Sequence, residues 1–451
     1  MDMKAIFDEG PPPPCPAPFN LAAHVLGRAP EQPEKVALSV VGPSSSTDWS
    51  YAALESAVRG TGAGLLEAGI QPGEPVLMRL GNTVDFPIAY LGAIAAGIVP
   101  IPTSAQLTGP EVAAMIGTLR PAAVLRDPSV ASGPHDREIT LDHLTAMRDL
   151  PGCDYAMGDP DRLAYVIYTS GTSGKPSAVA HAHRAIWARQ MMFDGWYGLT
   201  EDDRLLHAGA FNWTFTLGTG LMDPWTAGAT ALIPETGIEP EDLPVLLRKN
   251  DATIFAAAPG VYRKLLQHRE SLDLPRLRHG LAAGEKLSKS IHTRWSEATG
   301  GKPLCEAFGM SEISTFISVS PDHPARGDAL GRPQIGRRVA ILGPDGPVQR
   351  GEAGTIAVRR DDPGLMLGYL GAPEATEARM QGEWFLTGDQ GVMAADGQVS
   401  YLGRADDMMN AGGYRVSPLE VEAALLTHPG ITQVGCAEVE GKTDARLIVA
   451  V

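Results

Sequence analysis

The sequence predicts an α/β protein with mostly parallel sheets, then a smaller antiparallel region and a short C-terminal domain. Up to about Gly331, short apolar runs alternate with helical patterns, the order that parallel strands joined through helices produce. Beyond that point, β-type runs are separated by turn clusters instead. A chain of 451 residues is also too long for one core, so two or more domains are expected.

The first elements follow from composition and capping residues. Residues 1–18 are rich in proline, and we expect them to be irregular. Ser50 is placed to cap a helix that runs through Ala68 and ends at Gly69. The alternation then predicts further elements: strand 76–78, helix 85–96, strand 98–101 and strand 122–125.

The alternation of strands and helices continues up to about Gly331. The expected elements are strand 163–167, strand 253–257, a helix from Val261, a strand near Leu281 and a helix from Ser288. Short β-type runs follow at 339–342, 355–358 and 399–401, and Ser417 is placed to cap a helix through Leu426.

Composition excludes several classes of function. The net charge of -16 argues against binding nucleic acid or an anionic membrane, because both need clustered Lys and Arg. The four cysteines are scattered without zinc-type or disulfide-type spacing, and the N-terminus lacks a signal-peptide pattern, so a cytoplasmic location is expected. The longest apolar stretch, 86–101, is broken by proline and glycine, so no membrane span is expected.

A stretch rich in hydroxyls and glycine, 168–177, follows the apolar run 163–167. Its glycines allow backbone N–H groups to converge, its hydroxyls add donors, and Lys175 adds a positive charge, which together suit a polyphosphate. It is not the P-loop NTPase pattern, because only two residues separate the glycines and Pro176 follows the lysine. A solvated Ser/Gly loop remains the alternative from composition alone.

The run Tyr-Thr-Ser-Gly-Thr-Ser-Gly-Lys-Pro in this stretch resembles the phosphate loop of the acyl-adenylate-forming superfamily. That superfamily includes acyl-CoA synthetases, luciferases and the adenylation domains of peptide synthetases. The resemblance runs from about Phe19 and implies ATP-dependent activation of a small carboxylic acid to acyl-AMP. Thioester formation with coenzyme A would follow, so ATP, Mg²⁺ and coenzyme A are the implied cofactors.

The resemblance also implies a domain organisation. We expect a large domain, 1–403, of doubly wound, mostly parallel sheets with a small β-barrel. A hinge at 404–406 would lead to a small, mobile α+β domain at 407–451. Family members carry a catalytic lysine farther beyond the hinge than Val451, so we expect the natural chain to continue and assign no residue to that role.

Two motifs provide the implied reaction centre. Phe308-Gly309-Met310-Ser311-Glu312 resembles the aromatic-Gly-x-Thr-Glu motif, with Ser in place of the usual Thr. The match implies that Glu312 ligates Mg²⁺, Ser311 hydrogen-bonds the α-phosphate, and Phe308 and Gly309 lie at the adenine; a hard cation does prefer carboxylate oxygen. The phosphate-loop residues implied to be catalytic are Lys175 and Thr169, and those implied to bind ATP are Ser170, Gly171, Thr172, Ser173 and Gly174.

Further motifs resemble the nucleotide and coenzyme A segments of the family. Gly284 and Glu285 match the segment that wraps adenine. Asp389, in Thr-Gly-Asp, matches the carboxylate that takes the ribose hydroxyls. Beyond it, Arg404 matches a contact to the ribose or phosphate, and Asp406 matches the hinge pivot. The residues that match the coenzyme A path are Gly412, Gly413 and Arg415.

The segment 210–217 matches the border of the acyl pocket in the family. Phe211, Trp213 and Phe215 are the candidate pocket residues, although the register is open by about two residues and a core aromatic pair is the alternative. No aspartate occurs between Leu205 and Met222, where amino-acid-activating relatives hold the substrate ammonium, so activation of an amino acid is disfavoured.

Two rival functions remain open at this point. One is an acyl-AMP ligase that loads a carrier protein, and the other is a non-catalytic nucleotide-binding relative. The sequence does not name the acid, and it leaves open whether two copies associate as a homodimer.

Overall fold

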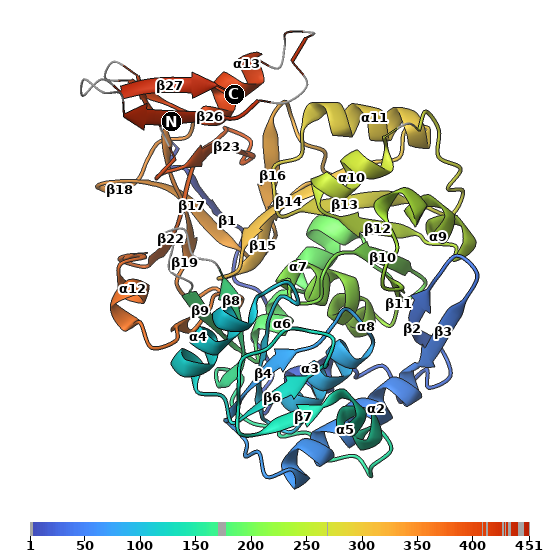
Figure 1. The fold of residues 1–451 in the computed structure, drawn as a ribbon. Coiled ribbons are helices and arrows are strands. Elements are labelled where there is room, and N and C mark those ends of the chain that lie inside the picture. Colours follow the sequence, from blue (N-terminus) through green and yellow to red (C-terminus); the bar gives the residue numbers. More distant parts are fainter. Residues whose placement is uncertain are drawn as a thin grey trace.

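The computed structural model describes residues 3–169, 177–267, 269–407, 409–411, 414–425, 428, 430–431, 434–440 and 446–450. Its central sheet contains six parallel strands, in the order β14-β13-β12-β10-β11-β2, with β3 antiparallel at the edge (Figure 1). Their bounds are β2 Val36–Val41, β3 Ser46–Ser50, β10 Arg204–Ala208, β11 Thr230–Pro234, β12 Ile254–Ala257, β13 His279–Ala283 and β14 Leu304–Met310.

Helices cover both faces of this sheet, as the alternating pattern predicts. Phe255 and Ala257 of β12 pack with α9 (Leu243–Lys249), α10 (Pro259–Leu265) and α11 (Lys289–Thr299). The alternate residues Ile254 and Ala256 belong to a separate apolar cluster on the opposite face. Successive side chains of a strand point to opposite faces, so a strand covered on both sides is apolar throughout.

A second, four-stranded parallel sheet has the order β5-β4-β6-β7. The elements of this part are α1 Leu21–Val25, α2 Tyr51–Glu67, β4 Pro75–Arg79, α3 Asp85–Ala95, β5 Val99–Pro102, α4 Gly109–Leu119, β6 Ala123–Arg126, β7 Glu138–Thr140 and α5 Leu141–Met147. The predicted Ser50 cap is confirmed, because its side chain accepts the Ala53 N–H. The helix expected from Ser288 is α11, and Ser288 caps it by accepting the Ile291 N–H.

The C-terminal half of the central sheet is antiparallel. It continues from β14 through β15 (Ser314–Ser318), β16 (Ala329–Pro333), β23 (Val399–Arg404), β22 (Trp384–Met393), β19 (Ala353–Arg359) and β17 (Arg338–Gly343). The runs expected at 339–342, 355–358 and 399–401 are therefore strands. Among the described residues the pairings follow an open path, so they do not contain the closed β-barrel that was expected.

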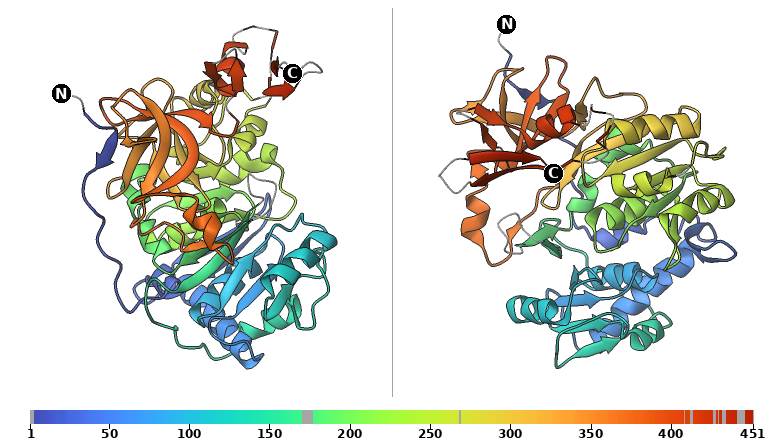
Figure 2. Two further views of the ribbon diagram at one scale, coloured as in Figure 1. Left: turned by 90° about the vertical axis from the view of Figure 1, so that its left-hand side faces the viewer. Right: turned by 45° about the horizontal axis from the view of Figure 1, so that its top comes forward.

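The proline-rich N-terminal segment corrects one prediction. We expected residues 1–18 to be irregular, but β1 (Ile6–Asp8) pairs antiparallel with β17 at the edge of the sheet. Ala5 and Phe7 are buried there. In Figure 2 the blue N-terminal segment runs along the outside of the molecule and ends against the orange strands.

A small three-stranded sheet holds the segment before and after the proposed phosphate loop. β8 (Leu163–Thr169) pairs antiparallel with β9 (Ser177–Ala182), and β20 (Gly368–Tyr369) adds to β9. The predicted strand 163–167 is confirmed. Residues 170–176, which connect β8 to β9, lie outside the described residues.

The remaining helical elements are short: α6 Ala185–Ala188, a π-helical turn Phe193–Tyr197, α7 Thr214–Leu217, a π-helical turn Gly218–Met222, α8 Asp223–Ala227, a 3₁₀ turn Pro240–Asp242 and α12 Pro373–Glu377. The short strands are β18 Gly346–Pro347 and β21 Met380–Gln381. No helix of the described chain combines the length and the apolar character needed to cross a lipid bilayer.

The described residues after Arg404 form two hairpins and one helix. They are β24 Met409–Ala411, β25 Tyr414–Val416, α13 Pro418–Leu425, β26 Cys436–Glu440 and β27 Arg446–Ala450. The helix expected after Ser417 is present, and it contacts β23. The division at 404–406 and the mobility of this segment remain predictions.

Candidate active site

The turn between β14 and β15 carries Ser311 and Glu312. The strand ends in a bulge between Phe308 and Gly309, where the backbone approaches β15 closely. A Cβ on Gly309 would lie 2.2 Å from the carbonyl oxygen of Ser314. Position 309 therefore requires glycine.

The Glu312 carboxylate is held by a tyrosine from a distant segment. The Tyr369 hydroxyl donates to Glu312 Oε1 at 2.7 Å, and the Met366 N–H donates to the Glu312 carbonyl at 2.8 Å. Burial, and then the nearby carboxylate, raise the pKa of Tyr369. The phenol therefore keeps its proton and remains a donor.

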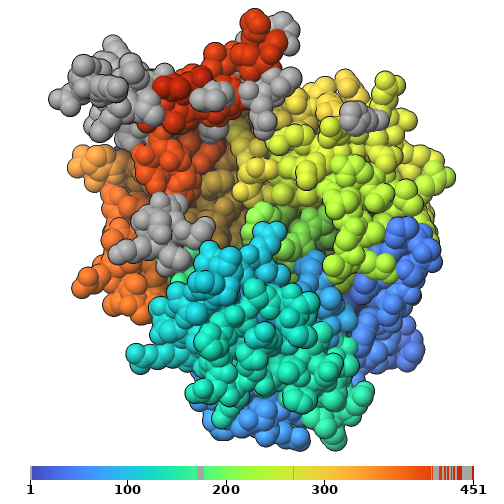
Figure 3. Space-filling view, viewed as in Figure 1, coloured from blue at the N-terminus to red at the C-terminus, as the bar shows by residue number. Residues whose placement is uncertain are grey.

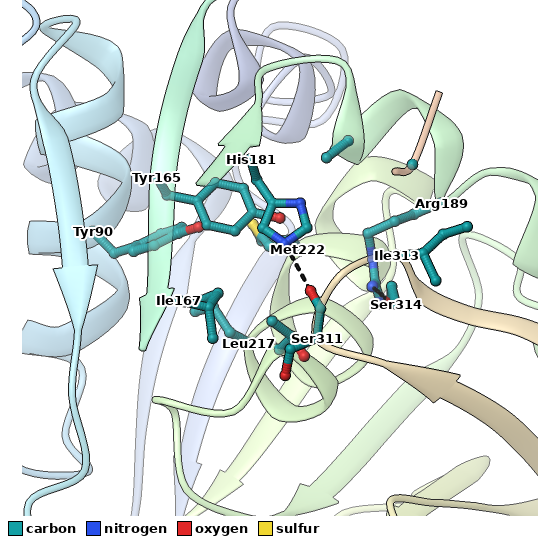
Figure 4. Close-up of a pocket in the computed structure, with 13 residues that line it drawn as sticks. Tyr90, Tyr165, Ile167, His181, Arg189, Leu217, Met222, Ser311, Ile313 and Ser314 are labelled. Carbon is teal, nitrogen blue, oxygen red and sulfur yellow. Dashed lines mark hydrogen bonds between the residues drawn. The ribbon is translucent and has the colours of Figure 1, made fainter. Parts of the chain in front are cut away.

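Ser311 is fixed through its backbone. His181, on β9, donates its Nε2–H to the Ser311 carbonyl at 2.7 Å, as the dashed line in Figure 4 shows. Burial lowers the pKa of His181 to about 4, so the ring is neutral near pH 7 and keeps this proton on Nε2. The turn that carries Ser311 and Glu312 is thus tied to the strand that follows the proposed phosphate loop.

A second group of residues, which includes the predicted Asp389 and Arg404, meets where β22 pairs with β23. The Tyr401 hydroxyl donates to Asp389 Oδ1 at 3.2 Å, and Arg404 Nη1 lies 3.7 Å from the same oxygen. The ring of Phe308 lies 5.6 Å from that of Tyr401, between centroids. The proposed adenine and ribose residues, Phe308 and Asp389, are therefore joined through Tyr401.

Asp389 is 5% exposed. Burial raises its pKa, while the Arg404 charge and the Tyr401 hydrogen bond act in the opposite direction. A buried carboxylate with a remaining acceptor oxygen suits hydroxyl donors. Arg404 also donates from Nε to Asp406 at 3.1 Å, so the predicted pivot residue is paired with the predicted ribose or phosphate contact.

Gly284 and Glu285, the residues predicted to wrap adenine, lie beside the exposed side chain of Trp213. Gly284 has φ +101°, and a Cβ at this position would lie 3.8 Å from the Trp213 ring. Trp213 is 49% exposed. Glu285 accepts the Gly260 N–H at 2.9 Å, at the start of α10, so its side chain serves the helix terminus.

The aromatic residues of 210–217 differ in their surroundings. Phe211 is buried and its ring lies 5.8 Å from that of Phe86. Phe215 is half-buried and its ring is stacked 5.8 Å from that of Trp196. These two rings pack within the protein, whereas Trp213 faces solvent. Trp213 and Phe215 therefore do not form the core aromatic pair that was the alternative.

A pocket lies between β8, β9, the β14–β15 turn and α7 (Figure 4). Phe211, Trp213 and Phe215 do not line it; its walls include Tyr90, Tyr165, His181, Arg189, Leu217 and Ser311. The rings of Tyr165 and His181 are stacked 4.9 Å apart. Tyr90 Oη and His181 Nδ1 have no hydrogen-bond partner among the described residues. Buried polar atoms of this kind usually bond to ordered water.

One wall of the pocket is a buried ion pair. Arg189 Nε donates to Asp223 Oδ1 at 2.8 Å, and Arg189 Nη2 donates to Oδ2 at 2.7 Å. The Tyr197 hydroxyl also donates to Oδ2 at 2.7 Å, and Arg189 Nη1 donates to Ser314 Oγ. The arginine thereby joins α8 to the first residue of β15, immediately after the Glu312 turn.

Sequence reasoning did not identify Tyr369, Tyr401, His181 or Arg189. Tyr369 follows a glycine in a turn-rich region, and Arg189 stands in a short helical stretch, so neither has a local signal of function. The alternation of β8 places Tyr165 and Ile167 on the same face as Thr169. That signal could have directed attention to the pocket beneath the strand.

Several predicted residues cannot be placed. Those in the phosphate loop and the coenzyme A path that lie outside the described residues are Ser170, Gly171, Thr172, Ser173, Gly174, Lys175, Gly412 and Gly413. Thr169 is the last residue of β8, and Arg415 is the middle residue of β25. Their roles stay predictions.

Glu312 is the described carboxylate that the resemblance assigns to the implied Mg²⁺. In the part of the chain that the structure describes, no three His, Cys, Asp or Glu side chains converge as a complete metal site. Mg²⁺ at nucleotide sites uses one or two carboxylates, with phosphate oxygens and water completing the octahedron. Glu312 alone therefore fits this ion together with a bound polyphosphate.

Glu306, on β14, provides a test by pH. It accepts the Leu287 N–H at 2.8 Å, and burial raises its pKa from 4.5 to about 7. Between these values the folded protein binds more protons than the unfolded one, so this group makes stability fall as pH rises. Glu306→Gln should remove this dependence and stabilise the protein at pH 8 by about 3 kcal/mol, with little effect at pH 4.5.

The measurement is urea unfolding of both proteins at pH 4.5 and pH 8. Glu55→Gln is the matched control, since Glu55 accepts a hydrogen bond from Tyr155 in another part of the fold. An equal difference between wild type and Glu306→Gln at both pH values would show that this carboxyl has an ordinary pKa.

Comparison with known families now defines the class of protein. Residues 27–370 match the AMP-binding enzyme family, which is most of the chain, and the protein belongs to this family. The resemblance to acyl-adenylate-forming enzymes is therefore confirmed.

The relatives include ligases that act on different acids. The 3-hydroxybenzoate–CoA ligase of Aromatoleum sp. (strain CIB) is 28% identical over 455 residues, covering 95% of this chain and 86% of that protein. The oxalate–CoA ligase of Arabidopsis thaliana is 28% identical over 428 residues, covering 89% and 82%. The crystal structure of ATP-bound MatB from Rhodopseudomonas palustris has a TM-score of 0.86 and 25% identity, covering 96% of this chain and 88% of that one. The chain thus has the α/β fold of adenylate-forming enzymes and is distantly related to acyl- and aryl-CoA ligases.

Proposed function

We propose that the protein activates a carboxylic acid with ATP to form acyl-AMP and pyrophosphate. It then transfers the acyl group to the thiol of coenzyme A, releasing AMP. The observation that carries this proposal is the convergence of motif residues from separate segments. Phe308, Tyr401 and Asp389 are in contact, with Arg404 beside them and Ser311 and Glu312 on the adjoining turn.

Each group has a distinct part in this proposal. The carboxylate of the acid attacks the α-phosphorus, the bond to the pyrophosphate oxygen breaks, and negative charge increases around the phosphate. Phe308 supports the adenine, Asp389 accepts the ribose hydroxyls, and the Ser311 hydroxyl donates to the α-phosphate. Glu312 would hold Mg²⁺, which supplies charge neutralisation at the phosphates.

Acid-dependent exchange of labelled pyrophosphate into ATP tests the first half-reaction. A panel of aromatic, aliphatic and dicarboxylic acids is appropriate, because one of the related ligases named above acts on 3-hydroxybenzoate and another acts on oxalate. Exchange with at least one acid is expected. Bound ATP without exchange for any acid would favour the non-catalytic alternative.

The acceptor is tested separately. After acyl-AMP formation, free coenzyme A or a phosphopantetheinylated carrier protein is added and the thioester is measured. The proposal expects rapid transfer to free coenzyme A. Transfer to the carrier alone would identify the protein as a carrier-loading acyl-AMP ligase.

Trp213 is the residue through which acid preference can be tested without damaging the core. Its side chain is about half exposed, so Trp213→Ala should leave the unfolding midpoint close to that of wild type. If Trp213 borders the acyl pocket, the difference in activation free energy between two acids, obtained from their kcat/KM values, should change by about 1–3 kcal/mol. This is the range for altering an apolar pocket wall. The measurement compares kcat/KM for each acid of the panel in the two proteins. The KM for ATP is measured as well, because the Trp213 ring also lies over Gly284 of the proposed adenine segment. An unchanged acid profile would place the pocket away from Trp213.

A further inference from the structure

The hydrogen bond between Tyr369 and Glu312 joins two segments that are 57 positions apart in the sequence. The donor is a protonated phenol and the acceptor is a carboxylate, a pairing stronger than one between neutral groups. It occupies one lone pair of Oε1 and leaves the rest of the carboxylate to accept from another group. The bond therefore fixes the orientation of the carboxylate without blocking it.

Tyr369 is itself fixed by its strand. Its N–H donates to Thr376 Oγ1 at 2.9 Å. On either side, Leu367 N–H donates to Ala180 O at 2.8 Å and Leu370 N–H donates to Ala178 O at 2.7 Å. The tyrosine is thus anchored to β9, the strand that begins directly after the proposed phosphate loop.

We propose that Tyr369 is a positioning residue for the metal-binding carboxylate of Glu312. The inference rests on the proposed function, because it requires Glu312 to hold the ion. Through the phenol, the carboxylate keeps a fixed place relative to β9, the strand that begins directly after the proposed phosphate loop. Hydrogen-bond partners of metal ligands commonly contribute about 10–100-fold in metal affinity.

The alternative is that the bond contributes only to local stability. A structural role predicts weaker binding of ATP with or without metal, whereas a positioning role acts only when the metal is present. The effect of Mg²⁺ on ATP affinity separates the two. This effect is the ratio of the ATP dissociation constant in EDTA to that in saturating Mg²⁺, and it requires no turnover.

The experiment measures this ratio by calorimetry for the wild type, Tyr369→Phe, Glu312→Gln and Tyr155→Phe. Tyr155→Phe is the matched control, because its hydroxyl donates to Glu55 Oε1 at 3.0 Å, an equivalent Tyr–Glu bond outside the site. Tyr369→Phe should lower the ratio about tenfold or more and leave ATP affinity in EDTA unchanged. Tyr155→Phe should leave both quantities unchanged.

The outcomes distinguish failure of the inference from failure of the proposed function. If Glu312→Gln lowers the ratio and Tyr369→Phe does not, the positioning role is wrong and the metal assignment stands. An equal loss of affinity in EDTA and in Mg²⁺ for Tyr369→Phe would also overturn the inference. If Glu312→Gln leaves the ratio unchanged, the metal assignment itself is wrong, and the role of Tyr369 fails with it.

Discussion

Glu312→Gln should reduce turnover by about 10²-fold or more at saturating Mg²⁺, because it removes a preorganised charge from the reaction centre. The amide is nearly isosteric, and it retains an oxygen that can accept from Tyr369. The turn should therefore keep its shape while the negative charge is lost. Acid-dependent pyrophosphate exchange gives the rate.

Glu55→Gln serves as the control, since that carboxylate also accepts from a tyrosine hydroxyl but lies on α2. It should retain the turnover of wild type. Near-native turnover of Glu312→Gln at saturating Mg²⁺ would mean that another group holds the metal, and the proposed reaction centre would have to be revised.

Asp223→Leu should lower the free energy of unfolding by about 3–5 kcal/mol, the typical cost of removing one partner of a buried ion pair. The Arg189 side chain is 7% exposed and that of Asp223 is 1% exposed. The guanidinium cannot lose its proton under ordinary conditions, so it would remain buried without its counter-ion. Urea unfolding followed by circular dichroism measures the loss.

The double variant Arg189→Met/Asp223→Leu tests the cause of this loss. If an unpaired charge is responsible, the double variant should be more stable than Asp223→Leu alone, because both ionic groups are gone. Equal stability of the single and double variants would instead assign the loss to the packing of the aspartate side chain.

Most elements with a local signal could be predicted from the sequence. The helix after Ser50 has a capping side chain at one end and Gly69, with φ +84°, at the other. β1 could not be predicted in this way. It is three residues long, and its partner strand begins at Arg338. A strand stabilised by so distant a pairing leaves no periodic signal in its own sequence.

The candidate site divides along the same line. Residues in contiguous motifs, such as Ser311 and Glu312, could be proposed because the turn that presents them is local. Tyr369 and Tyr401 come into contact with the carboxylates only through strand pairing. The aromatic residues of 210–217 were ambiguous for another reason: α7 begins at Thr214, so side-chain direction changes within the segment and neither a strand nor a helix period describes it.

The position of β1 also affects how the protein behaves at high concentration. An uncovered strand edge presents unpaired N–H and C=O groups to which a second chain can add, which is a common origin of aggregation. β1 pairs with this edge of β17 from Ile6 to Asp8. Figure 3 shows the orange part of the chain on the left of the molecule. With only three residues, β1 is itself a very short edge strand, so it leaves a second molecule fewer unpaired groups than the uncovered edge of β17 would. This task is separate from the chemistry of the site.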